Sequence, residues 1–527
     1  MKTHTKIKTV NGHDYAYEIT YYYDKATKRS RQRSRYLGKV VNGEIVRVRE
    51  GGKLPLHALS YGEFLPLVAI AEALALPKAL VAHLPDDKAQ AALALAVGRV
   101  ARPLACANVA SWVEGTVLPE LYPQAHFSSQ YLSKLLAELG KSDVPYRVAG
   151  EIARAAGPDA KLVYDITSLS SRAKGISYLE WGYSRDGADL PQVNLSLVVD
   201  KGLGIPVAYD IAPGSVVDVT TLRETLSRLE GMGVSGYSLV MDRGFFSTGN
   251  IEALLDAGVS FLIPATGALK CVKEAYSALR KTIEVPEHSR IHGGELLFAA
   301  DVALDVGGRA VPGHGYFSPK RREDEVASFY RGLHEAVARL EAAHVRSWHD
   351  WRELARHLAR GYHKYLGCRV TEGRFEVSYK RNAISARLNR CGLLILLHND
   401  GASWQEALTA YRERDIVEKG FRSLKSELAA LPLNAKREDT LRGGIFIAFL
   451  ALAIRMRLRR LMNERGLSEK YTMAQLLIEL EKVRAVRQAS GRLALSHVTK
   501  RQREILEALD VDVHLIECMM EGEKKED

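Results

Sequence analysis

The chain has 527 residues, more than one hydrophobic core usually accommodates, so several structural units are expected. Its 74 lysines and arginines outnumber its 63 aspartates and glutamates, and the formal charge of +11 favours a polyanionic partner, although ordinary surface charge explains it equally well. Five widely separated cysteines argue against disulfides and a structural zinc site, so a reducing cytoplasm is expected. The amino terminus lacks the apolar region of a secretory signal, and the longest apolar run, 445–454, is too short to cross a bilayer and predicts a buried helix.

The first two predicted units differ in their periodicity. Residues 1–55 alternate apolar and polar positions and predict a β-ribbon with a basic turn, which is either a solvated hairpin or a ribbon that touches DNA phosphates. Residues 56–155 have helical spacing and predict a helical, DNA-binding domain. Its amphipathic helix after Ser128 is either the second helix of a helix-turn-helix or a plain bundle helix. The basic turn contains five cations: Lys28, Arg29, Arg31, Arg33 and Arg35.

From residue 156 to 267 the pattern becomes one of strands. Three strands follow one another, and helix and strand then alternate, which predicts a mixed α/β sheet whose first and fourth strands can lie side by side. The expected strands are 161–166, 193–199, 205–211, 238–241 and 261–263, with helices near 218–229 and 251–255.

The rest of the chain divides into three parts. Residues 268–390 lose the regular rhythm and are interpreted as an insertion domain. The rhythm resumes in 391–455, with a strand at 392–397 and a helix from about Ser403, and 456–527 predicts a helical C-terminal region.

Two aspartates, Asp165 and Asp242, stand at the carboxyl ends of the first and fourth predicted strands. Ligands gather at this edge of an α/β sheet, so the two side chains could share an ion. Because an aspartate that follows a strand is often only a cap for the next helix, that alternative stays open for each residue taken alone.

A third acid, Glu418, lies on a predicted helix between cations. Tyr411, Arg414, Arg422 and Lys425 share its stripe at 3.6 residues per turn. A surface helix with an ion pair from Arg414 to Glu418 is the alternative interpretation. A second stripe a quarter turn away is expected to pack on the sheet and consists of Val417, Phe421, Leu424 and Leu428.

Together the three acids suit hard, oxygen-seeking cations, and no histidine or cysteine cluster competes for that role. Two Mg²⁺ or Mn²⁺ ions in one active site could activate a water or a 3′ hydroxyl and stabilise the leaving oxygen at phosphorus. The neighbouring cations would then hold the phosphates of the strand being cut.

The spacing Tyr411-x₂-Arg414-x₃-Glu418-x₆-Lys425 resembles the signature of the insertion-sequence-four superfamily of bacterial DDE transposases. Segments 164–168 and 241–245 resemble its two aspartate motifs, and the basic start ending at 36–39 resembles the subgroup numbered sixteen thirty-four. The resemblance covers about 160–265 and 390–455 in the expected order. At 441–445 the chain departs from it, because the histidine expected near Gly444 is absent.

This resemblance implies a ribonuclease-H-like catalytic core interrupted by an insertion domain. It implies Asp165, Asp242 and Glu418 as metal ligands, and Tyr411, Arg414, Lys425 and, less firmly, Arg422 as contacts to the DNA end. The implied activity is cleavage at terminal inverted repeats and strand transfer into target DNA, by a homodimer that pairs the ends of double-stranded DNA. A cytoplasmic, nucleoid-associated bacterial protein without a membrane partner is expected.

Three other interpretations stay open. A metal-dependent DNA nuclease on the same core would share the first chemical step, so only strand transfer separates the two. A domesticated, non-enzymatic DNA-binding relative is disfavoured by the intact acids. A phosphatase or other small-molecule metalloenzyme leaves the cationic helix face without a purpose. Trp404 is a candidate to hold a flipped base, although a core tryptophan is the favoured interpretation of its position.

Overall fold

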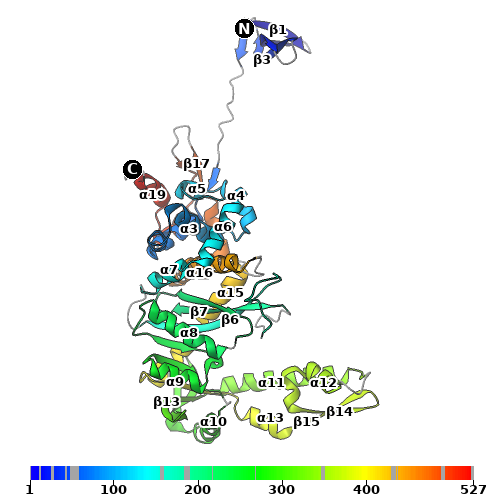
Figure 1. Cartoon of the computed structure of the whole chain (residues 1–527), viewed down its shortest axis with the longest axis vertical. Helices are drawn as coiled ribbons and strands as arrows, with labels where there is room; N and C mark the ends of the chain where they lie inside the picture. Colours follow the sequence, from blue (N-terminus) through cyan, green and yellow to red (C-terminus); the bar gives the residue numbers. More distant parts are fainter. Residues whose placement is uncertain are drawn as a thin grey trace.

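The computed structural model describes residues 2–10, 13–24, 29–41, 44–47, 58–154, 160–182, 190–216, 218–266, 269–345, 351–428, 435, 437–487 and 493–523. Within these ranges the chain has a mixed α/β fold built around one nine-stranded sheet, with helices against its faces (Figure 1). Three smaller sheets of four, three and two strands accompany it.

The N-terminal strands form an antiparallel four-stranded sheet. They are β1 (Lys2–Val10), β2 (His13–Asp24), β3 (Arg29–Val41) and β4 (Glu44–Arg47), paired in chain order. Tyr17 pairs with Lys6 on one side and with Tyr36 on the other, and the rings of Tyr17 and Tyr36 lie 5.4 Å apart. The strands expected here are therefore present, but the expected basic turn is wrong for Arg29, Arg31, Arg33 and Arg35, which belong to β3, and Lys28 lies outside the described residues.

A helical region follows, and it contains one strand that was not expected. Its helices are α1 (Phe64–Ala73), α2 (Leu76–Val81), α3 (Asp86–Ala101), α4 (Cys106–Val113), α5 (Leu118–Leu121), α6 (Ser129–Lys141) and α7 (Val144–Arg154). The strand β5 (Ala58–Ser60) pairs with β17 (Arg484–Arg487), which pairs with β18 (Leu493–Leu495). The expectation of helix alone in 56–155 and 456–527 is thus wrong, because strands this short leave no readable alternation in a sequence.

The central sheet confirms that the first and fourth predicted strands lie side by side. Its strand order is β11-β12-β13-β16-β10-β9-β6-β7-β8, and β6 and β9 run parallel, side by side. The five strands predicted in 156–267 are β6 (Lys161–Ser170), β7 (Gln192–Asp200), β8 (Ile205–Pro213), β9 (Ser238–Met241) and β10 (Ser260–Pro264). The helices between them are α8 (Asp218–Gly231) and α9 (Thr248–Asp256). Every residue of β7 is buried, as expected for a central strand covered on both faces.

The segment expected to be an insertion domain belongs in part to the central sheet. After α10 (Lys270–Thr282), three strands extend the sheet through β13 and β16, which pair antiparallel. These strands are β11 (Ser289–His292), β12 (Glu295–Val306) and β13 (Arg309–Phe317). An unpaired edge of β16 would expose a row of backbone donors and acceptors, and these strands cover it.

Residues 319–391 form an outer lobe that projects to one side of the sheet (Figure 1). Its elements are α11 (Pro319–Glu341), α12 (Trp351–Ala359), β14 (Leu366–Thr371), β15 (Arg374–Tyr379) and α13 (Arg381–Leu388). The outer lobe has its own hydrophobic core, separate from the main one. The chain enters and leaves it at one place, where Phe317 pairs with Leu393 and the Ser318 N–H donates to the Gly392 carbonyl at 3.0 Å.

After β16 (Leu393–His398) the chain turns helical. The elements are α14 (Trp404–Arg412), α15 (Asp415–Arg422), the π-helical turn Ser423–Glu427, α16 (Glu438–Glu464), α17 (Met473–Glu481), α18 (Lys500–Ala508) and α19 (Leu515–Glu523). Short 3₁₀ helices occur at Arg243–Phe245, Pro286–His288, Arg360–Tyr365 and Leu467–Glu469.

The long helix α16 joins the helical region to the sheet. It packs against α3, α6 and β8, and the apolar run 445–454 is buried within it, as predicted. A Cβ added at Gly443 would lie 2.0 Å from the Leu136 carbonyl oxygen, so α16 and α6 cross in backbone contact. Because α16 runs unbroken through residues 455 and 456, the boundary predicted there is wrong.

Over the described residues, no single helix meets the length and hydropathy of a membrane span, and only the pair Asp86–Ala101 and Cys106–Val113, bent by 88°, meets them jointly.

Candidate active site

The first two acids are brought together by the register of the central sheet. Tyr164 of β6 pairs with Met241 of β9, and the next residue on each strand is Asp165 and Asp242. β6 continues to Ser170 alongside β7, so Asp165 lies at the point where β9 departs and not at the strand end that was predicted. Two parallel strands that separate at the same level leave both carboxylates at one edge of the sheet.

Two aromatic side chains beneath the acids connect their strands. The rings of Tyr164 and Phe245 lie 4.8 Å apart, and both side chains are buried. The Tyr164 hydroxyl lies 3.1 Å from Thr221 Oγ1, and burial raises the pKa of Tyr164 to about 12. The Asn250 amide donates to the Phe245 carbonyl at 2.8 Å, which fixes the short turn after Asp242. The positions of the two acids are therefore set by packing beneath them.

The third acid arrives on a helix that differs from the expected one. α14 ends at Arg412 and α15 starts at Asp415, and between them Arg414 N–H donates to Tyr411 O at 3.2 Å in a tighter i to i+3 turn. The predicted continuous stripe is therefore wrong at this break. The break still leaves the Arg414 guanidinium over the Tyr411 ring, 5.5 Å from its centroid. Burial raises the pKa of Tyr411, so its hydroxyl stays protonated at neutral pH.

The predicted apolar stripe of α15 positions Glu418. Its four members are buried, with Val417 and Phe421 in α15 and the other two just after it, and α15 packs against β6 and β7, as expected. A Cβ added at Gly420 would lie 3.2 Å from Met456 Sδ, so α15 also lies tightly against α16. With this face held, the stripe about a quarter turn away carries Glu418 toward the two aspartates.

One guanidinium bridges all three acids. Arg414 Nη2 lies 2.7 Å from Glu418 Oε1, and Nη1 lies 3.4 Å from Asp242 Oδ1 and 3.8 Å from Asp165 Oδ2. The Arg414 side chain is only 15% exposed. Three carboxylates and one guanidinium give this group of four side chains a summed formal charge of −2. The ion pair between Arg414 and Glu418, expected only of a surface helix, thus forms within the site.

The acids line an open cleft of ≈ 620 Å³. Arg414, Arg422 and Lys425 line this cleft with the acids. Lys425 belongs to the π-helical turn, and such turns are common at functional sites. Trp404 lies elsewhere, between Arg290 and His292, so it is not beside the acids.

The donor set of the cleft suits a hard divalent cation, because it consists of carboxylate oxygens. As the side chains stand, however, no group of three histidine, cysteine, aspartate or glutamate side chains among the described residues is arranged to hold one ion. The acids instead share Arg414. The carboxylates are therefore the right ligand type for a divalent metal ion, and in this structure the Arg414 guanidinium is the cation that they contact.

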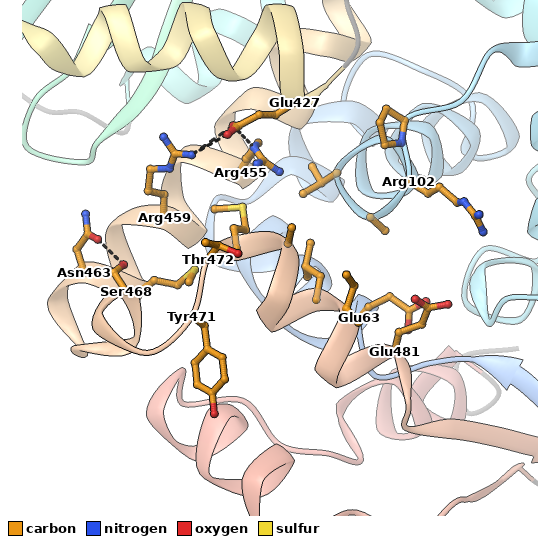
Figure 2. A pocket seen from close by; sticks show the side chains of 18 of the residues that line it. Glu63, Arg102, Glu427, Arg455, Arg459, Asn463, Ser468, Tyr471, Thr472 and Glu481 are labelled. Atoms are coloured by element: carbon orange, nitrogen blue, oxygen red, sulfur yellow. Dashed lines mark hydrogen bonds and ion pairs between the residues drawn. The ribbon is translucent and has the colours of Figure 1, made fainter.

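A larger cavity of ≈ 800 Å³ lies on the other side of the π-helical turn, between α3, α16 and α17 (Figure 2). There Glu427 accepts hydrogen bonds from Arg455 at 2.9 Å and Arg459 at 3.1 Å. Burial alone would raise the pKa of Glu427, but hydrogen bonds from Ser423 and Arg455 and the two arginine charges lower it to about 2. These bonds fasten the turn that carries Lys425 to α16. Sequence reasoning missed this anchor, whose only trace was the i,i+4 spacing of the two arginines.

Comparisons with known proteins address the family directly. Residues 157–454 match the family model described as a transposase DDE domain, and this range is more than half of the chain. A search of curated proteins finds no match. Among solved structures, the piggyBac transposase in a synaptic complex with hairpin DNA is similar at 10% identity, over 79% of each chain, with a TM-score of 0.37. On the strength of the family match, the chain belongs to the DDE-domain transposases.

Proposed function

We propose that this chain cleaves DNA at terminal inverted repeats and joins the freed ends to a target, using two Mg²⁺ or Mn²⁺ ions held by Asp165, Asp242 and Glu418. The observation that supports this proposal is the convergence of these acids, far apart in sequence, on one guanidinium. The strand order β8-β7-β6-β9-β10, with β6 and β9 parallel, supports a ribonuclease-H-like core. By resemblance, the chain is a bacterial member of the insertion-sequence-four superfamily.

Each side chain of the cleft has a role in this proposal. The oxygens of Asp165, Asp242 and Glu418 hold the ions, which, when bound, would activate a water or a 3′ hydroxyl and stabilise the leaving oxygen. Arg422 and Lys425 hold the phosphates of the strand being cut, because cations that line a cleft form charge-assisted hydrogen bonds with phosphate oxygens.

The DNA end would meet Tyr411 and Arg414 on its way to the acids. Their stacked arrangement presents a planar donor, and planar guanidinium groups match phosphate oxygens in a two-pronged geometry. The N-terminal sheet and the helical region would bind the double-stranded repeats, and a homodimer would pair two ends.

Replacing Glu418 with Gln tests the assignment. Glu418→Gln keeps the shape of the side chain and removes a ligand, so cleavage of inverted-repeat DNA is expected to fall at least about a hundredfold, in line with the loss of a metal-supported step, while binding persists. Asp415→Asn is the matched control. Asp415 lies on the same helix and pairs with Lys419 outside the cleft, so this variant should cleave normally.

The assay uses the DNA that flanks the reading frame, and it measures nicking and strand transfer on gels in Mg²⁺ and in EDTA. Normal cleavage by Glu418→Gln would overturn the metal assignment. Cleavage without joining would favour a nuclease, and binding without either step would favour a domesticated DNA-binding relative.

A further inference from the structure

The place of Arg414 among the three acids has a consequence for ion binding that goes beyond the proposed function and rests on it. Its guanidinium is within 4.0 Å of an oxygen from each acid, and the contact with Glu418 is a direct hydrogen bond. A bound divalent ion requires the same oxygens at about 2.0–2.1 Å. The guanidinium and an ion cannot occupy this space together, because both are positive and both need the same lone pairs.

We propose that Arg414 is a displaceable counter-ion, which keeps the acids paired until a divalent ion and a DNA phosphate take over its two contacts. The ion takes the carboxylates, and the phosphate takes the guanidinium. The two ligands then favour each other's binding, because each removes the interaction that opposes the other.

The surroundings of Arg414 can accommodate its guanidinium after it leaves the acids. It lies over the Tyr411 ring, which can support it in more than one position. It lines the cleft beside Arg422 and Lys425, where a phosphate backbone is expected to pass. Arg414 also sits in the turn between α14 and α15, so its movement does not require a helix to unwind.

The backbone on both sides of this group is well supported, which confines the change to the side chain. Asp165 Oδ1 accepts the N–H of Ile166 at 2.8 Å, and α15 is held by its buried face. Removing the guanidinium should therefore leave the acids in place and remove the group that competes with a divalent ion for their oxygens.

The experiment measures Mn²⁺ binding to the full-length protein without DNA, by electron paramagnetic resonance of the free ion. Arg414→Ala and Arg414→Gln should both bind Mn²⁺ about tenfold more tightly than the wild type, a size typical of coupling between sites. Arg422→Ala is the matched control, because Arg422 is exposed in the same cleft and carries the same charge, and it forms no ion pair with an acid within the described residues. Its affinity should rise much less.

A second arm adds a saturating duplex of 40 base pairs with mixed sequence. Wild-type protein should then bind Mn²⁺ more tightly, and Arg414→Ala should gain less. Equal affinities of Arg414→Ala, Arg414→Gln and wild type without DNA would overturn the proposal, as would an equal rise in Arg422→Ala or an equal gain from DNA in every variant.

Asp165→Asn distinguishes a failure of this proposal from a failure of the proposed function on which it rests. If Asp165→Asn binds Mn²⁺ as well as wild type does, the acids are not the ion site and the proposed function fails. If Asp165→Asn loses binding while the Arg414 variants do not gain it, only the displacement of Arg414 is refuted. Circular dichroism of each variant checks that the fold is retained.

Discussion

Replacing the buried acid Glu63 with Gln should stabilise the protein at alkaline pH and not at acidic pH. Glu63 precedes α1 and lines the cavity of Figure 2, its side chain is 7% exposed, and its Oε2 has no hydrogen-bond partner among the described residues. Burial, with a smaller contribution from the charge of Glu481, raises the pKa of Glu63 from 4.5 to about 7, against the opposing charge of Arg484. The folded state therefore retains a proton that the unfolded chain releases.

The sign and size follow from that difference. Between pH 4.5 and 7 the folded state binds more protons, so the free energy of unfolding falls as the pH rises. At about 1.4 kcal/mol per pKa unit, the cost of the buried charge reaches about 3 kcal/mol at pH 8 and stays below about 1 kcal/mol at pH 5. Glu63→Gln removes this cost because Gln carries no charge at either pH.

The assay is urea unfolding of the full-length protein at pH 5 and pH 8, followed by circular dichroism. Glu114→Gln is the control, since Glu114 is an exposed acid of the same helical region. Glu63→Gln should gain stability over wild type at pH 8 by about 3 kcal/mol, and Glu114→Gln should gain little at either pH. A gain of the same size at both pH values, or no gain at pH 8, would refute the reasoning.

Two further predictions concern the supports of the site. Gly443→Ala should destabilise the protein by about 3 kcal/mol, because the added Cβ would clash with the Leu136 carbonyl oxygen. Gly444→Ala is the control, because its Cβ would meet open space, and it should stabilise the protein by up to about 1 kcal/mol. Thermal unfolding of both variants measures the difference. Glu427→Ala should cost about 3 kcal/mol at pH 7, because it leaves the buried Arg455 unpaired. The stabilising effect of Glu427 is present above pH 4.5 and lost as the pH falls toward 2, so urea midpoints of variant and wild type should converge in acid.

The strands that carry the two aspartates could be predicted because their signals are local. Each strand has its own apolar run, and the order of strands and helices restricts which of them can be neighbours. The adjacency of β6 and β9 follows from that order. The position of Asp165 was less predictable, because the continuation of β6 to Ser170 depends on pairing with β7 and not on the residues of β6 alone.

The arrangement around Glu418 was harder to predict. Helical spacing placed Arg414 and Glu418 on one stripe, and their ion pair forms at 2.7 Å. Spacing alone could not show that the same guanidinium also reaches Asp165 and Asp242, because those contacts depend on how α15 packs against the sheet. It also missed the turn at Arg414, since 404–422 has no proline or glycine near the break.

The extension of the sheet by β11, β12 and β13 was not predictable from their own residues. These strands have mixed burial along their length. They belong to the sheet because β13 pairs with β16, a strand far away in the sequence that a local pattern does not contain. Long-range pairing of this kind is decided by tertiary contacts.

The outer lobe is replaceable, because the chain enters and leaves it at one place. Phe317 and Leu393 face each other as partners in adjacent strands, so a short hairpin turn in place of 318–392 would close without stretching either strand. Since the outer lobe buries its own core, its unfolding need not disturb the sheet. Loss, exchange or enlargement of the lobe is therefore open to evolution and to protein engineers with little effect on the acids, whose strands β9 and β6 lie two and three strands along the sheet from β16.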